Sequence, residues 1–271
     1  MKKLLLTLLF SVSTVFAWDQ VPPQPPQACA AQVPYGMPQS QRPGPIICRH
    51  AYISQNDVQA KLPIWVSYAL TPQHALGCMP RSNAFAPDAS LPKGQRAELK
   101  DYAGSGFDIG HTAPDGDMSF DNQAELESFL LTNMTPQLPG LNRGIWKLLE
   151  TAVRGWAMER GHEMVIYAGP IYSTSDKTIG PDQIVVPHAF YKIVTDTATN
   201  EVAGFIFPHV GNQGNNLLVV RASIQQIEQQ TGIQFKFPAN AIELPANQLW
   251  SVDYGMLTKT KKSTCGINSS D

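Results

Sequence analysis

Positive charge is scarce in this sequence, since 20 Lys and Arg face 22 Asp and Glu and the formal net charge is −2. Non-specific binding to nucleic-acid phosphates is driven by Lys and Arg, so this balance argues against a broad basic surface and leaves room only for a local one. Beyond the N-terminus, no segment approaches the roughly 18 uninterrupted apolar residues that a membrane-spanning helix needs. There is no Cys-x-x-Cys pair, so zinc-ribbon and thioredoxin-like centres have no support. Neither an internal repeat nor a domain break is visible, which predicts a single α+β domain.

The N-terminus has the features of a signal peptide. Lys2 and Lys3 form a short basic region before a mostly apolar run over residues 4–16, and the small Ala17 occupies a usual cleavage position. The run is too short to span a bilayer comfortably. We therefore expect residues 1–17 to be removed and the protein to be periplasmic or secreted. Losing the two lysines would change the formal charge from −2 to −4.

Four cysteines remain after such cleavage, and an even number in an exported protein favours disulfides, with three possible pairings. Cys29 and Cys48 are the expected pair, because they flank part of the Pro-rich N-terminal stretch and a bridge between them would pin it to the domain. The chain-entropy model assigns so short a loop about 3 kcal/mol of stabilisation. Cys265 is the residue expected to tether the C-terminal tail, if anything does.

Composition divides the chain into three parts after the signal peptide. Residues 18–45 are rich in Pro and Gln, so we expect them to wrap the surface or lead into the domain rather than build a helix. Residues 46–258 form the predicted domain, in which a mixed or antiparallel sheet combines with helices. Residues 259–271 form a polar tail.

Periodicity places the elements of this domain. The clearest helix covers residues 142–161, with apolar positions at helical spacing, Asn142 as N-cap and Gly161 as the C-terminal stop. A second helix is expected over residues 219–231, and residues 81–94 are typical of a loop. Strands are expected at 62–70, 128–137, 164–170, 189–196 and 201–209, with a turn at 197–200 between the last two. Residues 107–114 are expected to be a strand that runs into a turn.

Polar residues near the start of the first helix and on the strand before it suit phosphodiester hydrolysis. Such a reaction needs a base to activate water and a cation to neutralise the charge that grows on the phosphate and the leaving oxygen. Neutral imidazole, here His111, suits the first task near neutral pH. Magnesium suits the second and takes few oxygen ligands from protein, such as the Asn142 carbonyl and the Glu150 carboxylate. On an unbroken helix these two residues would lie roughly 80° apart and could flank one spot.

Four short motifs occur in a fixed order around these residues. They are Asp108-Ile109-Gly110-His111, Asn133-Met134-Thr135-Pro136-Gln137, Asn142-Arg143-Gly144-Ile145-Trp146 and Leu149-Glu150. Each residue by itself has a structural explanation, such as a His in a turn, an N-cap or a solvated helix face, so the set carries the argument. The set resembles the DNA/RNA non-specific endonucleases, the ββα-metal or His-Me finger nucleases that include the Serratia-type enzymes and mitochondrial endonuclease G. The resemblance covers roughly residues 46–235, and Arg81 in RSNAF is similar to the family's phosphate-binding arginine.

The resemblance implies a ββα-metal catalytic motif in an α+β fold, and it assigns roles to individual residues. His111 would be the general base, Asn142 the direct magnesium ligand and Glu150 the holder of metal-bound water. Asn133 would help to order the site, and Arg81 would bind the phosphate. With Mg²⁺, or Mn²⁺ in its place, the family hydrolyses single- and double-stranded DNA and RNA to 5′-phosphorylated products, so both nucleic acids are the expected substrates.

One position departs from the family motif, since Ile109 stands where the family has Arg. Residues two apart on a strand point to the same face, so Ile109 should face the substrate on the side of His111. Two interpretations stay open: Arg143 supplies the missing guanidinium, or Ile109 packs in the core and Arg143 is a solvated residue. The substitution and the negative charge also leave open a catalytically silent member that binds nucleic acid or a partner. A different metal-dependent phosphodiesterase and a non-enzymatic secreted domain are further alternatives.

Overall fold

The computed structural model of the chain describes residues 25–266. The predicted signal peptide over residues 1–17 therefore lies outside the described residues, and so do residues 18–24 of the Pro- and Gln-rich segment. Within the described part, no helix combines the length and the apolar character that a membrane crossing requires.

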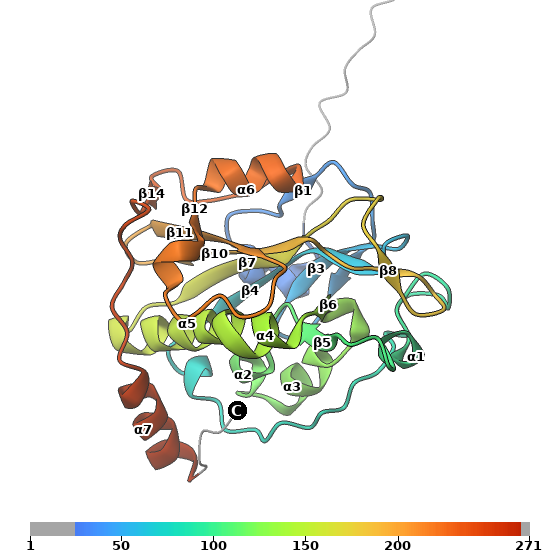
Figure 1. Cartoon of the computed structure of the whole chain (residues 1–271). Helices are drawn as coiled ribbons and strands as arrows, with labels where there is room; N and C mark the ends of the chain where they lie inside the picture. The colour runs from blue at the N-terminus through green and yellow to red at the C-terminus, as the bar shows by residue number, and fades with distance from the viewer. Residues whose placement is uncertain (1–24, 267–271) are drawn as a thin grey trace, which may run out of the picture.

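An eight-stranded sheet runs through the middle of the molecule (Figure 1). In spatial order its strands are β12 (Arg221–Ala222), β11 (Glu201–Pro208), β10 (Ala189–Asp196), β7 (Met164–Ile171), β4 (Leu62–Leu70), β3 (Ile53–Asp57) and β2 (Ile46–Cys48), with β14 (Ile242–Glu243) beside β11. The strands pair antiparallel, except that β14 runs parallel to β11. Strands β4, β7 and β10 are buried along almost their whole length, which explains why their sequences are continuous runs of mostly apolar residues rather than alternations.

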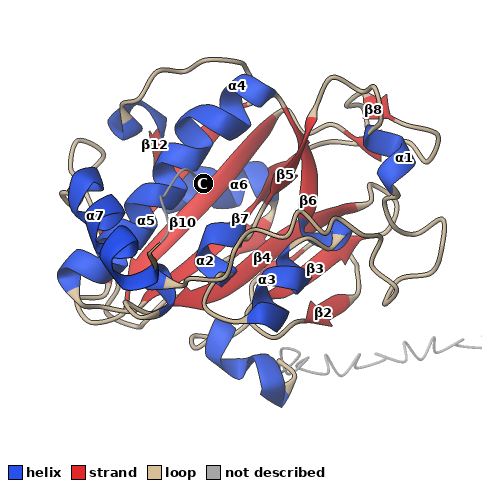
Figure 2. Cartoon of the chain, turned by 90° about the horizontal axis from the view of Figure 1, so that it is seen from below, coloured by secondary structure: helices blue, strands red, loops and turns tan. Residues whose placement is uncertain are grey.

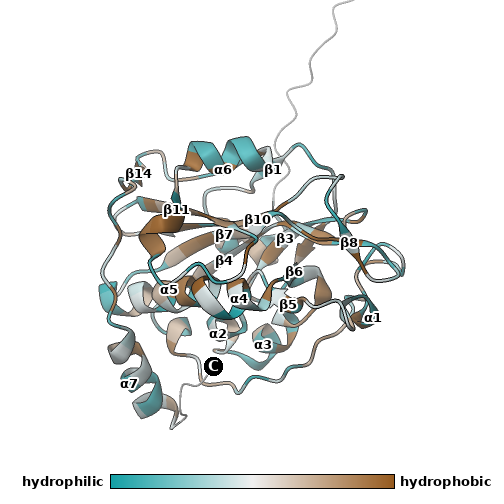
Figure 3. Ribbon diagram, viewed as in Figure 1, coloured by the Kyte–Doolittle hydropathy of each residue, from teal (hydrophilic) through white to brown (hydrophobic). Residues whose placement is uncertain are grey.

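Helices cover both faces of this sheet, so each face has its own hydrophobic core (Figures 1 and 2). Helix α5 (Lys147–Arg160) packs on one face and buries Trp156 there. On the other face, helix α6 (Ile224–Thr231) buries Ile227 and the 3₁₀ helix η1 (Gln27–Gln32) buries Cys29 in one hydrophobic cluster. Colouring by hydropathy shows the brown strands of the sheet between more polar outer segments (Figure 3). The predicted combination of a sheet with helices is confirmed.

A smaller antiparallel pair, β5 (Asp108–His111) and β6 (Met134–Gln137), precedes α5 in the chain. His111, at the end of β5, is paired with Met134. Between the two strands lie α2 (Asp115–Met118), α3 (Asn122–Ser128) and the 3₁₀ turn η3 (Leu131–Asn133). Between β6 and α5 lie α4 (Pro139–Leu141) and the wide turn η4 (Asn142–Trp146). Two strands followed by a helix are the arrangement that the resemblance implies.

The remaining elements lie outside the central sheet and the β5–β6 pair. They are β1 (Gln39–Ser40) paired with β13 (Ile233–Gln234), β8 (Thr178–Ile179) paired with β9 (Ile184–Val185), the helices α1 (Leu99–Tyr102) and α7 (Tyr254–Cys265), and the 3₁₀ turns η2 (His74–Leu76) and η5 (Leu217–Val220). Short strands expose few unpaired backbone groups, which limits edge-to-edge pairing.

The strands predicted at 62–70, 164–170, 189–196 and 201–209 are confirmed to within a residue. Asn200 has a φ of 60° and closes the predicted turn between β10 and β11. Two predicted elements were too long. The segment 128–137 is a strand only from Met134, because it begins with the end of α3 and a buried 3₁₀ turn. The helix predicted over 219–231 begins only at Ile224, after the N-cap Ser223.

The predicted start of the long helix was wrong, and its predicted end is confirmed. Asn142 is no N-cap: its backbone is helical (φ −57°, ψ −50°), because a turn that starts at Pro139 has already begun. Gly144 then leaves helical geometry (φ −101°, ψ −118°), so regular α-helix starts at Lys147. Gly161 ends the helix in a left-handed conformation (φ 67°). The angle of roughly 80° expected between the two site residues therefore does not apply, since it assumes an unbroken helix.

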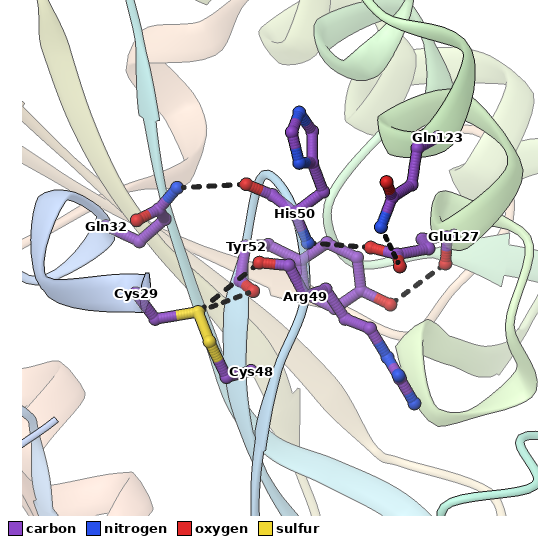
Figure 4. Close-up of a disulfide and its surroundings, with 8 residues drawn as sticks. All are labelled: Cys29, Gln32, Cys48, Arg49, His50, Tyr52, Gln123 and Glu127. Carbon is purple, nitrogen blue, oxygen red and sulfur yellow. Dashed lines mark hydrogen bonds between the residues drawn. A yellow bond between two sulfur atoms is a disulfide. The ribbon is translucent and has the colours of Figure 1, made fainter. Parts of the chain in front are cut away.

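The predicted disulfide Cys29–Cys48 is present and joins η1 to the end of β2 (Figure 4). Hydrogen bonds surround it: Gln32 donates to the carbonyl of His50, and the backbone N–H of His50 donates to Glu127 at 2.7 Å. The Pro-rich N-terminal segment is thus pinned to the sheet and, through Glu127, to helix α3. It also contains the short helix η1, which was not predicted from the sequence.

A second disulfide joins Cys78 to Cys265, 187 residues apart in sequence. It tethers the C-terminal segment as expected, but that segment is not a plain tail. Residues 254–265 form helix α7, which Asp253 caps by accepting a hydrogen bond from the N–H of Met256. Helix α7 packs against α5 and η2, and the expected start of the tail at residue 259 falls inside it (Figure 2).

Candidate active site

A cavity of about 920 Å³ opens beside the β5–β6 pair and the start of α5. Five of the six predicted site residues line it: Arg81, His111, Asn142, Arg143 and Glu150. They come from a loop, a strand end, the wide turn η4 and helix α5, so the fold gathers residues that are up to 69 positions apart. The sixth residue, Asn133, lies behind the cavity wall.

His111 is almost enclosed, with 8% of its surface exposed. The ring of Phe129 stands edge-on at 4.8 Å and that of Phe85 lies tilted at 5.7 Å. Its Nε2 is buried and has no hydrogen-bond partner among the described residues. Burial, and then the positive charge of Arg81, lower the pKa of His111 to about 3. The imidazole is therefore neutral at pH 7, the form that can accept a proton.

Asn133 is fully buried and holds the turn that follows His111. Its Oδ1 accepts a hydrogen bond from the N–H of Ala113 at 2.9 Å, and its Nδ2 donates to the carbonyls of Ala113 and Ser128, both at 2.8 Å. All of these partners are backbone groups. The side chain therefore fixes the backbone near His111 without lining the cavity.

Asp108, at the start of β5, orients the amide of Asn142. Its Oδ2 accepts hydrogen bonds from Asn142 Nδ2 at 2.9 Å and from Arg143 Nε at 2.8 Å, while Oδ1 accepts from Arg143 Nη2 at 2.6 Å. Although burial opposes it, these hydrogen bonds hold the pKa of the Asp108 carboxyl below its usual value. Because the NH₂ group of Asn142 donates its hydrogen bond to Asp108, the amide oxygen Oδ1 is the atom that can bind a cation.

Glu150 follows in the first turn of α5, beside a buried lysine on β10. Lys192 has no exposed surface, and its Nζ lies 3.9 Å from Glu150 Oε1 and 4.4 Å from the centroid of the Trp146 ring. Burial raises the pKa of Glu150 to about 7, against the opposing effect of Lys192. Burial likewise lowers the pKa of Lys192. A cation in the cavity would favour the ionised carboxylate.

Arg81 is held over the Phe129 ring, with its guanidinium 4.9 Å from the ring centroid. It donates to Asp115 Oδ2 from Nη1 at 3.1 Å and to Asn83 Oδ1 from Nε at 2.7 Å. Burial raises the pKa of Asp115 to about 6, Arg81 opposes this shift, and the neighbouring Glu125 adds to it. The guanidinium is thus fixed at the cavity wall by several partners.

Ile109 both lines the cavity and packs against a small core cluster, and it is partly buried. Its side chain therefore faces the side of His111, as the strand geometry predicts. Arg143 lines the same cavity with 72% of its side chain exposed, and it is bound to Asp108. The geometry allows both interpretations of Ile109.

Three residues that shape the site had no role predicted from the sequence. Asp108 was part of a recognised motif, but its contacts with Asn142 and Arg143 depend on the turn η4. Lys192 carried a signal that could have been used, since it is a charged residue within the otherwise apolar run AFYKIV of strand β10. Asp115 gave no signal, because its partner Arg81 lies 34 residues earlier.

Cations outnumber carboxylates around the cavity. The cations are Arg81, Arg143, Lys147, Arg154 and Lys261, and the carboxylates are Asp108, Asp115 and Glu150. The chain as a whole has a net charge of −2. Positive charge is therefore concentrated at this site, as expected for a local basic surface.

The model of a protein family described as DNA/RNA non-specific endonuclease matches residues 31–241. The chain belongs to this family. A nuclease from Nostoc is 33% identical over 183 residues, which are 63% of this chain and 65% of that protein. A nuclease from Syncephalastrum racemosum is 31% identical over 220 residues, 71% of this chain and 68% of that protein.

Mitochondrial nuclease 1 of Schizosaccharomyces pombe is 31% identical over 191 residues, 62% of this chain and 59% of that protein. The chain thus spans 59% of that relative and 65% of the Nostoc one. A solved structure of an EndoG/EndoGI complex contains a chain that superposes with a TM-score of 0.71 at 24% identity, covering 78% of this chain and 91% of that one. This likeness shows that the α+β fold is that of the solved chain.

Proposed function

We propose that this protein is an exported, magnesium-dependent endonuclease that hydrolyses phosphodiester bonds of DNA and RNA to 5′-phosphorylated products. One observation carries the proposal: a single cavity combines a neutral imidazole, an oriented amide oxygen, a carboxylate and a guanidinium. Membership of the family supports it, since several relatives are named nucleases.

His111 is the proposed general base. Its Nε2 is sealed in the protein, which leaves Nδ1 as the nitrogen to meet water from the cavity. The ring is neutral at pH 7, which is the form that can accept a proton from that water as it attacks phosphorus. Phe85 and Phe129 hold the ring in place, and Asn133 holds the backbone behind it.

The donor set suits magnesium. Asn142 offers Oδ1 because Asp108 takes its NH₂ group, and Glu150 offers a carboxylate on the same cavity. Among residues 25–266 no group of three or more His, Cys, Asp or Glu side chains gathers to hold a metal ion. Magnesium keeps several waters and needs only one or two protein oxygens, so Asn142 would bind it directly and Glu150 would hold its waters. When bound, Mg²⁺, or Mn²⁺ in its place, neutralises charge on the phosphate and leaving oxygen.

Arg81 is the proposed phosphate-binding residue, because its guanidinium is fixed at the cavity wall and matches the geometry of phosphate oxygens. Arg143 is the second candidate, at the rim. Its bond to Asp108 keeps the guanidinium next to Asn142 and therefore near the proposed cation. Whether it replaces the guanidinium that Ile109 lacks is tested by paired variants below.

Export is proposed from the N-terminal signal pattern, and the two disulfides support it, since disulfides persist in oxidising compartments. The protein would therefore act in the periplasm or the medium. Detection of a mature N-terminus near residue 18 in the periplasmic or culture fraction tests this part of the proposal.

The alternative function is a silent member of the family that binds nucleic acid or a partner without cutting it, and Ile109 at the Arg position favours it. One assay separates the two: supercoiled plasmid and RNA are incubated with purified protein and Mg²⁺, Mn²⁺ or a chelator. We expect cleavage with metal and none with chelator. We also expect His111→Ala and Asn142→Ala each to abolish most cutting, by about 10²-fold or more for the base, with an intact fold.

His50→Ala is a suitable control, because His50 is exposed and lies outside the cavity lining. This variant should cut like the wild type. Near-normal cutting by a folded His111→Ala protein would remove the mechanism. No cutting by the wild type with any of several metals would favour the silent binder.

A further inference from the structure

Helix α7 forms one wall of the cavity that contains His111. Leu257, Thr258, Lys261 and Cys265 all line this cavity. Leu257, Lys261 and Cys265 are four residues apart in turn, so they share one face of the helix. The family model matches residues 31–241, so this wall lies outside the matched residues.

The charge of α7 is of one sign. Residues 254–265, YGMLTKTKKSTC, contain Lys259, Lys261 and Lys262 and no Asp or Glu. Lys147 at the start of α5 lines the same cavity and is exposed. In a chain whose net charge is −2, this gathering of lysines makes α7 complementary to a polyanion.

The helix is fixed to the domain at both ends. Just before the helix, Val252 packs so closely on Gly155 of α5 that a Cβ at position 155 would collide with the Val252 side chain. The N–H of Asp253 donates to Glu159 Oε1 at 2.8 Å. At its end, the disulfide joins Cys265 to Cys78, three residues before Arg81. The wall formed by α7 and the loop that carries Arg81 are therefore held at a set spacing.

From this geometry we propose that α7 binds phosphates of the nucleic-acid chain other than the one being cut, with Lys261 as the main contact. A helix of 12 residues is about 18 Å long and could run along several nucleotides. The ligand class is thus a polynucleotide with several phosphates rather than a single phosphodiester. The inference rests on the proposed nuclease function and deepens it.

The test compares substrates of different length. For wild type and Lys261→Gln, kcat/KM is measured on a 30-base-pair duplex and on a thymidine dinucleotide, and the ratio of the two is formed. We expect the ratio to fall about threefold or more in Lys261→Gln and further in Lys261→Glu, with Lys261→Arg close to wild type. The salt slope of duplex binding, measured by fluorescence anisotropy in chelator, should shrink by about 0.9.

Lys262→Gln is the matched control, because it removes the same charge from the same helix at an exposed position outside the cavity lining. The ratio of kcat/KM on the duplex to kcat/KM on the dinucleotide should change less in Lys262→Gln than in Lys261→Gln. A thiol assay confirms that Cys78–Cys265 is intact in each variant. Equal effects of the two substitutions, or an unchanged ratio in Lys261→Gln and Lys261→Glu, would overturn the proposal.

The anisotropy measurement separates this inference from the nuclease function. If the wild type cuts neither substrate but Lys261→Gln still lowers the salt slope of duplex binding, the nuclease proposal fails and the α7 surface stands. If the wild type cuts both substrates and neither the ratio nor the slope responds to Lys261, the α7 proposal fails and the nuclease function stands.

Discussion

The enclosure of His111 predicts an unusual response of stability to pH. The unfolded imidazole titrates near pH 6.5. In the folded protein, burial and Arg81 lower the pKa of His111 to about 3. Between these values the unfolded chain binds a proton that the folded chain does not bind. The contribution of His111 to stability is therefore complete above pH 6.5 and is lost as the pH falls toward 3.

Lowering the pH from 7 to 5 should thus remove about 2 kcal/mol from the free energy of unfolding through His111 alone. Asp115 and Glu150 act in the opposite direction, because their raised pKa values make the folded state gain stability as they take up protons. A comparison with His111→Gln cancels their effect. Between pH 7 and pH 5 the wild type should lose about 2 kcal/mol more than the variant.

Urea unfolding followed by circular dichroism at pH 8, 7 and 5 measures this difference. Above pH 7, the free energy of unfolding of the wild type and of His111→Gln should depend on pH in the same way, because the imidazole is then neutral in both the folded and the unfolded chain. An equal dependence down to pH 5 would refute the argument, since it would mean that the folded ring titrates like an exposed one. In catalysis, the same enclosure means that protonation of His111 does not set the acid limb of kcat/KM near pH 6.5.

Three further outcomes test the surroundings of the base. If Arg143 replaces the guanidinium that Ile109 lacks, Arg143→Ala should slow plasmid cleavage about 10²-fold at fixed Mg²⁺ without changing the circular dichroism. Adding Ile109→Arg to this variant should restore part of the rate. Normal cutting by Arg143→Ala would mean that Ile109 is a packing residue. Asp108→Asn should raise the Mg²⁺ concentration for half-maximal cleavage about 10- to 100-fold, since the amide of Asn142 loses its orienting carboxylate; an unchanged Mg²⁺ titration would contradict this. Asn133→Ala should lower the free energy of unfolding in urea by about 3 kcal/mol or more, since three buried backbone groups lose their partners; wild-type stability would show that water replaces the side chain.

The site residues could be predicted from the order of the motifs, because most of them lie in a short stretch of the chain. His111, Asn142 and Glu150 lie within 40 positions, and the structure places all three on one cavity. The strands of the sheet were also predictable, since β7 and β10 are runs of mostly apolar residues that are buried along their whole length. The sheet order was not predicted, because it depends on pairings between distant segments.

The errors have a common physical cause, which is that tertiary contacts override local preference. Asn142 is a residue type typical of an N-cap, but Pro139 starts the turn earlier and the Asn142 amide donates a hydrogen bond to Asp108 on β5. The segment from Tyr254 to Cys265 is polar and has no strong apolar stripe, yet it is helical where Cys78 and α5 anchor it. Such contacts join positions up to 187 residues apart, and no local pattern encodes them.

The negative net charge can be reconciled with a polyanionic substrate by following where the cations are used. Arg49, Arg154 and Arg160 form ion pairs with Asp88, Asp117 and Asp196, whose side chains are buried, so the charge of these arginines is matched inside the protein. Arg81 and Arg143 are also paired, with Asp115 and Asp108, but both line the cavity. Four other cations line the cavity and could reach phosphates: Arg81, Arg143, Lys147 and Lys261. At about −0.9 for each contact, four contacts give a log–log salt slope of about −3 to −4 on duplex DNA. Binding measured by anisotropy between 50 and 200 mM salt, roughly the range over which this effect is large, should show this shallow slope. A slope near −10 would require a basic surface elsewhere on the chain, and the cavity would then be only part of the nucleic-acid interface.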